Sequence, residues 1–132
     1  MKGLHIIADL YNCQKGELLA SSHKLRELCV DACKDVGLTV LGDHFYQFDG
    51  HEGAQDGGST GAVVLAESHL AIHTWPERDG ATLDVYVCNF TADNTSKAEQ
   101  VYDILIKALK PADVMVERVM RGRDLPQKKR VA

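Results

Sequence analysis

The spacing of apolar residues changes several times along this chain, and that pattern constrains the fold more than any other feature. Segments in which apolar residues alternate with other residues, or form short apolar runs, are expected to be β-strands. Six segments meet this description: 4–11, 38–48, 62–66, 69–75, 81–90 and 112–120. No linker separates them, so a single sheet is the economical arrangement.

Two further segments have helical spacing. Residues 21–36 carry apolar side chains at i, i+3, i+4, i+7, i+8 and i+11, which places one stripe on one face, and Gly37 can end that helix in a left-handed conformation. Residues 94–110 have a similar stripe, and Ser96 with Glu99 predicts a capping box at its start.

The predicted order is therefore β-α-β-β-β-β-α-β. We predict an α+β fold, a two-layer sandwich in which two helices cover one face of a mostly antiparallel sheet. Residues 1–120 are expected to form one domain and residues 121–132 a basic C-terminal tail. Residues 49–61 are rich in Gly and Asp, lack periodicity, and are expected to form a loop.

Composition narrows the class of protein. No apolar run reaches the roughly 20 residues that span a bilayer, and the N-terminus lacks the features of a signal peptide, so we expect a cytoplasmic protein without a membrane partner. No C-x-x-C pair occurs, and we expect free thiols in a reducing compartment, in all four cysteines: Cys13, Cys29, Cys33 and Cys88.

The middle of the chain is acidic. No Lys or Arg occurs between Lys34 and Arg78, whereas that stretch holds several acids: Asp35, Asp43, Asp49, Glu52, Asp56, Glu67 and Glu77. Such a zone attracts cations and repels nucleic acid, although a solvated acidic loop explains it equally well. The basic tail is the only support for nucleic-acid binding, so we expect a small cationic partner and no nucleic acid.

Strand parity indicates where a site can lie. The aliphatic faces of 69–75 and 81–90 should pack against the helices, which leaves His73 and Cys88 on the opposite, uncovered face. Asp9 falls on the same face by the same parity. This face is a candidate site, a dimer surface, or both.

Two kinds of chemistry are suggested by the residues alone. His69, His73 and Cys88 could bind zinc, but no close cysteine pair or H-E-x-x-H helix supports a metal. Ser68 beside His69 suggests a serine hydrolase, but it is not in a G-x-S-x-G motif. The triplet Glu67-Ser68-His69 at a junction between two strands therefore suggests another role for the serine.

The segment "ESHLAIHTWPE" and a cysteine twenty residues after its serine resemble the prokaryotic S-adenosylmethionine decarboxylase proenzymes. The resemblance also covers "ADLYNC", the F-x-x-F of Phe45–Phe48, "TGAVVLAESH", "LDVYVC" and "ALKPADV". It implies self-cleavage between Glu67 and Ser68, giving a β chain of residues 1–67 and an α chain of residues 68–132. Ser68 would become a pyruvoyl group, the only cofactor, without metal or pyridoxal phosphate.

The resemblance also implies roles for individual residues. The pyruvoyl group from Ser68 would form a Schiff base with the substrate amine, Cys88 would donate a proton, and His73 would transfer a proton during processing. Phe48 would stack on adenine, and Glu77 would bind the ribose hydroxyls. The plain alternatives are that Phe48 belongs to the core and that Glu77 caps a hairpin.

This sequence departs from the family pattern at three places. Thr60 occupies the position of a processing serine, and neighbouring Ser59 could compete for that role. Asp9 replaces a common glutamate near the substrate, and the acidic loop Asp49–Gly58 replaces a shorter link.

The resemblance fixes the reaction more firmly than the substrate. S-adenosylmethionine decarboxylation for spermidine synthesis is the main interpretation, and L-ornithine or L-arginine is the alternative substrate. An unprocessed, non-catalytic partner subunit is the third hypothesis. We expect a homodimer of processed αβ units, as in the relatives.

Overall fold

The computed structural model describes residues 2–50 and 57–122, so most of the predicted tail and part of the acidic loop lie outside the described residues. Its elements follow the predicted order, with a short additional helix and one 3-10 turn. They are β1 (Gly3–Cys13), α1 (Gly16–Leu19), α2 (Ser22–Asp35), β2 (Val40–Gln47), β3 (Ser59–Leu65), β4 (Ser68–Trp75), η2 (Pro76–Arg78), β5 (Gly80–Cys88), α3 (Thr95–Leu109) and β6 (Pro111–Arg121).

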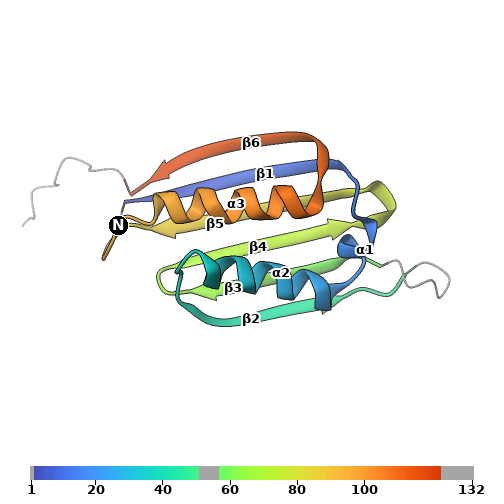
Figure 1. The fold of residues 1–132 in the computed structure, drawn as a ribbon, viewed down its shortest axis with the longest axis horizontal. Helices are drawn as coiled ribbons and strands as arrows, with labels where there is room; N and C mark the ends of the chain where they lie inside the picture. Colours follow the sequence, from blue (N-terminus) through green and yellow to red (C-terminus); the bar gives the residue numbers. More distant parts are fainter. Residues whose placement is uncertain (1, 51–56, 123–132) are drawn as a thin grey trace, which may run out of the picture.

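The six strands form one antiparallel sheet in the order β2-β3-β4-β5-β1-β6. Figure 1 shows α2 and α3 side by side across one face of this sheet. The α+β two-layer fold is therefore confirmed. None of the helices among the described residues has the length and apolarity to cross a bilayer.

The core lies between the helices and the covered face of the sheet. Leu70 and Ile72 of β4 and Val85 of β5 are fully buried there, as parity predicted. They pack with the helix stripes, including Leu25 and Leu105. No element of the described residues covers the other face of the sheet. That face exposes several large apolar side chains: Ile7, Tyr11, Tyr46, Val64, Trp75, Met115 and Val119.

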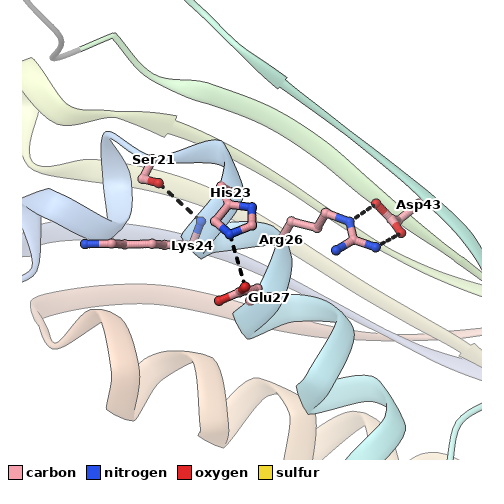
Figure 2. Close-up of polar contacts among 6 residues, drawn as sticks. All are labelled: Ser21, His23, Lys24, Arg26, Glu27 and Asp43. Carbon is pink, nitrogen blue, oxygen red and sulfur yellow. Dashed lines mark hydrogen bonds and ion pairs between the residues drawn. The ribbon is translucent and has the colours of Figure 1, made fainter.

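Helix α2 is fixed at its start and along its length (Figure 2). The Ser21 hydroxyl caps it by accepting the Lys24 N–H at 3.2 Å. The guanidinium of Arg26 donates to both carboxylate oxygens of Asp43 on β2, at 2.7 and 3.0 Å. Gly37 follows the helix with φ 89°, as its predicted role requires.

Two local predictions were wrong. Ser59, Thr60 and Gly61 belong to β3 and not to the preceding loop, because β3 pairs with β2 along its whole length and with β4 from Thr60 onward. The capping box does not form: the side chain of Glu99 pairs with Arg118 of β6 at 2.6 Å. Asp93 accepts the Thr95 N–H at the start of α3 instead.

Candidate active site

The predicted site residues form two groups at opposite ends of β4. Ser68 begins the strand, and His73 lies near its other end. Five residues of extended chain span about 17 Å. We call Ser68, Tyr86 and Cys88 the serine cluster, and Phe48, Thr60, His73 and Glu77 the histidine cluster.

The serine cluster is built on the hairpin between β3 and β4. Leu65 pairs with Ser68, so Ala66 and Glu67 alone make the turn. Glu67 has φ 61°, a left-handed conformation that glycine adopts easily and that costs about 1 kcal/mol or more in other residues. The predicted scissile bond thus follows a strained residue.

Ser68 is held in place by β5. Its Oγ accepts the backbone N–H of Cys88 at 3.1 Å, and both residues are buried, 8% and 6% exposed. The Asn94 side chain in turn donates to the Cys88 carbonyl at 2.9 Å. The serine and the cysteine that the family resemblance singles out are therefore neighbours.

Tyr86 joins these two residues to a charged neighbourhood that sequence reasoning missed. The guanidinium carbon of Arg121 lies 4.7 Å from the centre of the Tyr86 ring, and the rings of His5 and His69 lie 5.8 and 5.5 Å away. Burial and then the Cys88 thiol raise the pKa of Tyr86, whereas Arg121 lowers it. Arg121, from outside the acidic middle of the chain, therefore places a cation at this end of the sheet. Strand β6, which brings Arg121 here, extends one residue into the segment assigned to the tail.

His5 has no partner within hydrogen-bonding distance at its buried Nε2, and the Asp84 carboxylate lies 3.7 Å from that nitrogen. Burial lowers the pKa of His5, and the charge of Asp84 opposes that change.

The histidine cluster is organised by a direct contact. Thr60 and His73 are partners in the β3–β4 register, and Thr60 Oγ1 lies 3.1 Å from His73 Nδ1. Ser59 points to the covered side and is 1% exposed, and its hydroxyl has no hydrogen-bond partner within residues 2–50 and 57–122. Thr60, and not Ser59, is therefore placed to act with His73.

A hollow of about 350 Å³ opens beside this pair. Its walls include Phe48, Ser59, Thr60, Trp75 and Glu77. The ring of Tyr46 packs edge-on against Phe48, with 4.9 Å between the ring centres. Phe48 is half exposed and not part of the core, so its side chain is available to a ligand.

A second hollow of about 670 Å³ adjoins the first through Trp75 and Glu77. Asp9 and Arg78 also line it. Asp9 pairs with Thr82 across β1 and β5, and Thr82 pairs with His73, so Asp9 lies in one row with the Thr60–His73 contact. Glu77 belongs to both hollows and lies within η2, in the turn that joins β4 to β5.

The structure does not bring together the residues that a zinc site or a serine hydrolase would need. His69 and His73 lie four positions apart on an extended strand, about 13 Å, and Cys88 is near the His69 end. Over residues 2–50 and 57–122, no group of three His, Cys, Asp or Glu side chains is arranged to hold a metal ion. Nor is His73 within reach of Ser68 in the same chain.

Comparison with known proteins decides the family. The sequence profile for S-adenosylmethionine decarboxylase matches residues 4–122. The S-adenosylmethionine decarboxylase proenzyme of Aquifex aeolicus (strain VF5) is 44% identical over 120 residues, which cover 91% of this chain and 81% of that protein. The proenzyme of Hydrogenobaculum sp. (strain Y04AAS1) is 43% identical with the same coverage. The chain belongs to the S-adenosylmethionine decarboxylase family.

A solved structure agrees with this assignment. The crystal structure of the adenosylmethionine decarboxylase from Aquifex aeolicus VF5 superposes with a TM-score of 0.79 at 38% identity, covering 97% of both chains. The resemblance read from the Glu67–Glu77 block is confirmed, and so is the enzyme class, a decarboxylase and hence a lyase. The names of the relatives do not favour an ornithine or arginine decarboxylase, or a non-catalytic subunit.

Proenzyme in these relatives' names denotes a precursor. A serine that becomes a new N-terminus can be converted to a pyruvoyl group. Ser68 follows a strained residue in a two-residue turn and has its Oγ fixed by a backbone N–H. The chemistry and the local geometry of Ser68 therefore suit that group.

Proposed function

We propose that this chain is a self-processing, pyruvoyl-dependent S-adenosylmethionine decarboxylase that cleaves itself between Glu67 and Ser68. The observation that carries the proposal is the hairpin at these two residues. Glu67 is held in a left-handed conformation immediately before a buried serine, and Cys88 donates a backbone hydrogen bond to that serine's Oγ.

Cleavage would begin with attack of Ser68 Oγ on the carbonyl carbon of Glu67. A C–O bond replaces the C–N bond of the peptide, and the hydroxyl proton passes to the released amine. Loss of the Ser68 α-proton then breaks the Cβ–Oγ bond, which frees the Glu67 carboxylate and leaves dehydroalanine. Water replaces the nitrogen, ammonia departs, and a pyruvoyl group remains. Strain at Glu67 favours the first step because breaking the peptide relieves it.

A base must accept the Ser68 α-proton, and we assign that role to His73, with Thr60 orienting its imidazole at 3.1 Å. Within one chain, however, about 17 Å of strand separates the two. The base that serves Ser68 is therefore the partner's His73.

A two-fold homodimer meets this requirement. Two copies that pack their uncovered sheet faces together, with their β4 strands running in opposite directions, bring the backbone at Ser68 of each protomer, where the α-proton is lost, to the histidine cluster of the other. A two-fold interface uses the same surface on both copies, so two identical sites result. The exposed apolar residues of this face, among them Ile7, Val64 and Val119, supply the surface that such packing would bury.

The substrate would lie in the hollow beside Phe48. S-adenosylmethionine carries a flat adenine, ribose hydroxyls, and a positive sulfonium and ammonium. Phe48 offers an aromatic face, Glu77 offers a carboxylate to the hydroxyls, and Asp9 adds negative charge in the adjoining hollow. A dibasic amino acid would leave the aromatic face unused.

In turnover, the pyruvoyl carbonyl, linked to the substrate amine, would supply a sink for the electrons of the bond between the α-carbon and the departing carboxylate. Cys88 returns a proton to the substrate's α-carbon after carbon dioxide has left. Two observations support that role: Cys88 adjoins Ser68 through its backbone N–H, and the residue is shielded from water. No metal or pyridoxal phosphate takes part in this scheme. The free thiols of the four cysteines suit a cytoplasmic location.

The test is to follow the purified chain by intact mass and then trap its carbonyl with borohydride. We expect fragments that correspond to 1–67 and 68–132. Only the second fragment should gain the mass that corresponds to reduction of a ketone. Carbon dioxide release should then be measured with S-adenosylmethionine, ornithine and arginine. An intact, untrapped chain that still releases carbon dioxide would contradict the processing scheme, and turnover of ornithine alone would contradict the substrate.

A further inference from the structure

The Glu67–Glu77 block contains a buried threonine, Thr74, that the proposed function leaves without a role. Thr74 follows His73 on β4, is 4% exposed, and points to the helix-covered side of the sheet. It lies at the back wall of the hollow that Thr60 and His73 line.

The hydroxyl of Thr74 connects three elements. Its Oγ1 accepts the backbone N–H of Ser59 at 2.8 Å and donates to the carbonyl of Leu19 at 2.7 Å. Ser59 is the first residue of β3, and Leu19 is the last residue of α1. The start of β3 is therefore tied to β4 and to the helical layer through one side chain.

These contacts adjoin the pair that matters for cleavage. Ser59 precedes Thr60, and Thr74 follows His73, so the Ser59–Thr74 bond lies directly behind the Thr60–His73 contact. Thr60 and His73 are also the outermost pair in the β3–β4 register. A strand end frays easily, and the buried bond adds to the pairing of Thr60 with Tyr46 and His73 in holding Oγ1 at 3.1 Å from the imidazole.

The same residue also supports the segment that carries Phe48. A Cβ added to Gly58 would lie 2.0 Å from the carbonyl oxygen of Thr74, so the chain passes against this residue too closely for any side chain. The Gly58 carbonyl accepts the N–H of Phe48 at 2.9 Å.

We propose that Thr74 is a positioning residue, whose buried hydroxyl holds Thr60 and His73 in hydrogen-bonding register from the helix-covered side of the sheet. It touches neither the scissile bond nor the substrate. The inference rests on the proposed function only in taking the Thr60–His73 pair to assist cleavage; the positioning itself is a property of the folded chain.

Two substitutions separate the hydroxyl from the bulk of the side chain. Thr74→Val keeps the shape and removes both hydrogen bonds, whereas Thr74→Ser keeps the hydroxyl. Val63→Ala is the matched control, because Val63 is fully buried on the same face of β3 and takes no part in the bonds. Val63→Ala should lower the melting temperature and leave the hydrogen bonds of the Thr74 hydroxyl in place.

The first readout is the rate of self-cleavage, followed by intact mass. Thr74→Val should cleave about 10- to 100-fold more slowly than the parent, since a small misplacement of a catalytic group has effects of that size. Thr74→Ser should cleave near the parent rate, and Val63→Ala should cleave faster than Thr74→Val even at an equal loss of melting temperature. Parent-like cleavage by Thr74→Val, or equal slowing by Val63→Ala, would overturn the inference.

The second readout does not depend on cleavage. In a Ser68→Ala background the chain stays intact, and ¹⁵N-histidine NMR reports the imidazole of His73, identified by its loss in His73→Gln. Thr74→Val should shift the His73 Nδ1 resonance, while the resonances of His23 on the exposed face of α2 stay unchanged. An unaltered His73 resonance would overturn the inference. If the parent chain never cleaves, the proposed function fails, and this readout still decides the role of Thr74.

Discussion

Ser68 and His73 lie at opposite ends of β4, with Ser68 on the helix-covered side of the sheet and His73 on the uncovered side. No rotamer change can bridge a gap of about 17 Å. The proposed cleavage therefore depends on a second copy of the chain, and this dependence can be tested genetically.

Co-expression of Ser68→Ala and His73→Gln chains should restore cleavage that neither variant performs alone. In a mixed dimer, one site carries both substitutions, and the other combines an intact Ser68 with an intact partner's His73. Mass spectrometry of differently tagged chains should find cleavage only in the His73→Gln chain. No cleavage in mixed dimers, with dimer formation verified by tag pull-down, would place both residues in one chain's site.

Thr60 and Ser59 should differ sharply on substitution. Thr60→Val removes the hydroxyl at 3.1 Å from His73 and should slow cleavage by about 10-fold or more. Ser59→Ala removes a buried hydroxyl that has no partner, so it should leave cleavage unchanged and raise the free energy of unfolding by up to about 1 kcal/mol. Cleavage time courses and urea denaturation measure the two effects, and equal slowing by both variants would contradict the assignment.

Glu67 offers a test of the stored strain. Glycine adopts φ 61° without cost, so Glu67→Gly in a Ser68→Ala background should raise the free energy of unfolding by about 1 kcal/mol. With Ser68 present, the same substitution should slow cleavage, because less strain is released. Urea denaturation of the Ser68→Ala chain with and without Glu67→Gly checks the first expectation. Cleavage time courses of the parent and of Glu67→Gly check the second. Faster cleavage in the glycine variant would show that strain does not drive the reaction.

Periodicity predicted the covered and uncovered faces because burial on one side of a strand follows directly from side-chain alternation. Leu70, Ile72 and Val85 are buried for this reason. The beginning of β3 was missed because Ser59 and Thr60 are small and polar, and only their pairing partners on β2 and β4 make them a strand.

Local sequence patterns could not predict contacts between segments that are far apart in the chain. Arg121 lies over Tyr86 because β6 and β5 both pair with β1, a relation that no sequence spacing shows. Glu99 had suitable spacing for a capping box, but Arg118 on β6 binds its carboxylate instead. The serine and histidine clusters were predicted as one site for the same reason, since parity gives a face and not a position along the strand.

Two glycines of neighbouring strands should respond oppositely to alanine. A Cβ on Gly61 would lie 2.1 Å from the Phe45 ring, so Gly61→Ala should lower the free energy of unfolding by about 1–3 kcal/mol. Gly42 has open space around the same position, and Gly42→Ala should change stability by less than about 0.5 kcal/mol. Urea denaturation of both variants compares them directly, and similar losses would show that Phe45 does not pack over Gly61.

Alkaline stability should report the buried thiols of α2. Burial raises the pKa of the Cys33 thiol from about 9 to about 11, and it also raises the pKa of Cys29. Above pH 9 the unfolded chain loses the Cys33 proton first, so the free energy of unfolding should fall by about 2 kcal/mol from this group by pH 11. Cys33→Ala should start less stable at pH 7 and then lose correspondingly less as the pH rises. Parallel stability curves for the two proteins in urea titrations from pH 8 to pH 11 would show that Cys33 titrates normally in the folded chain.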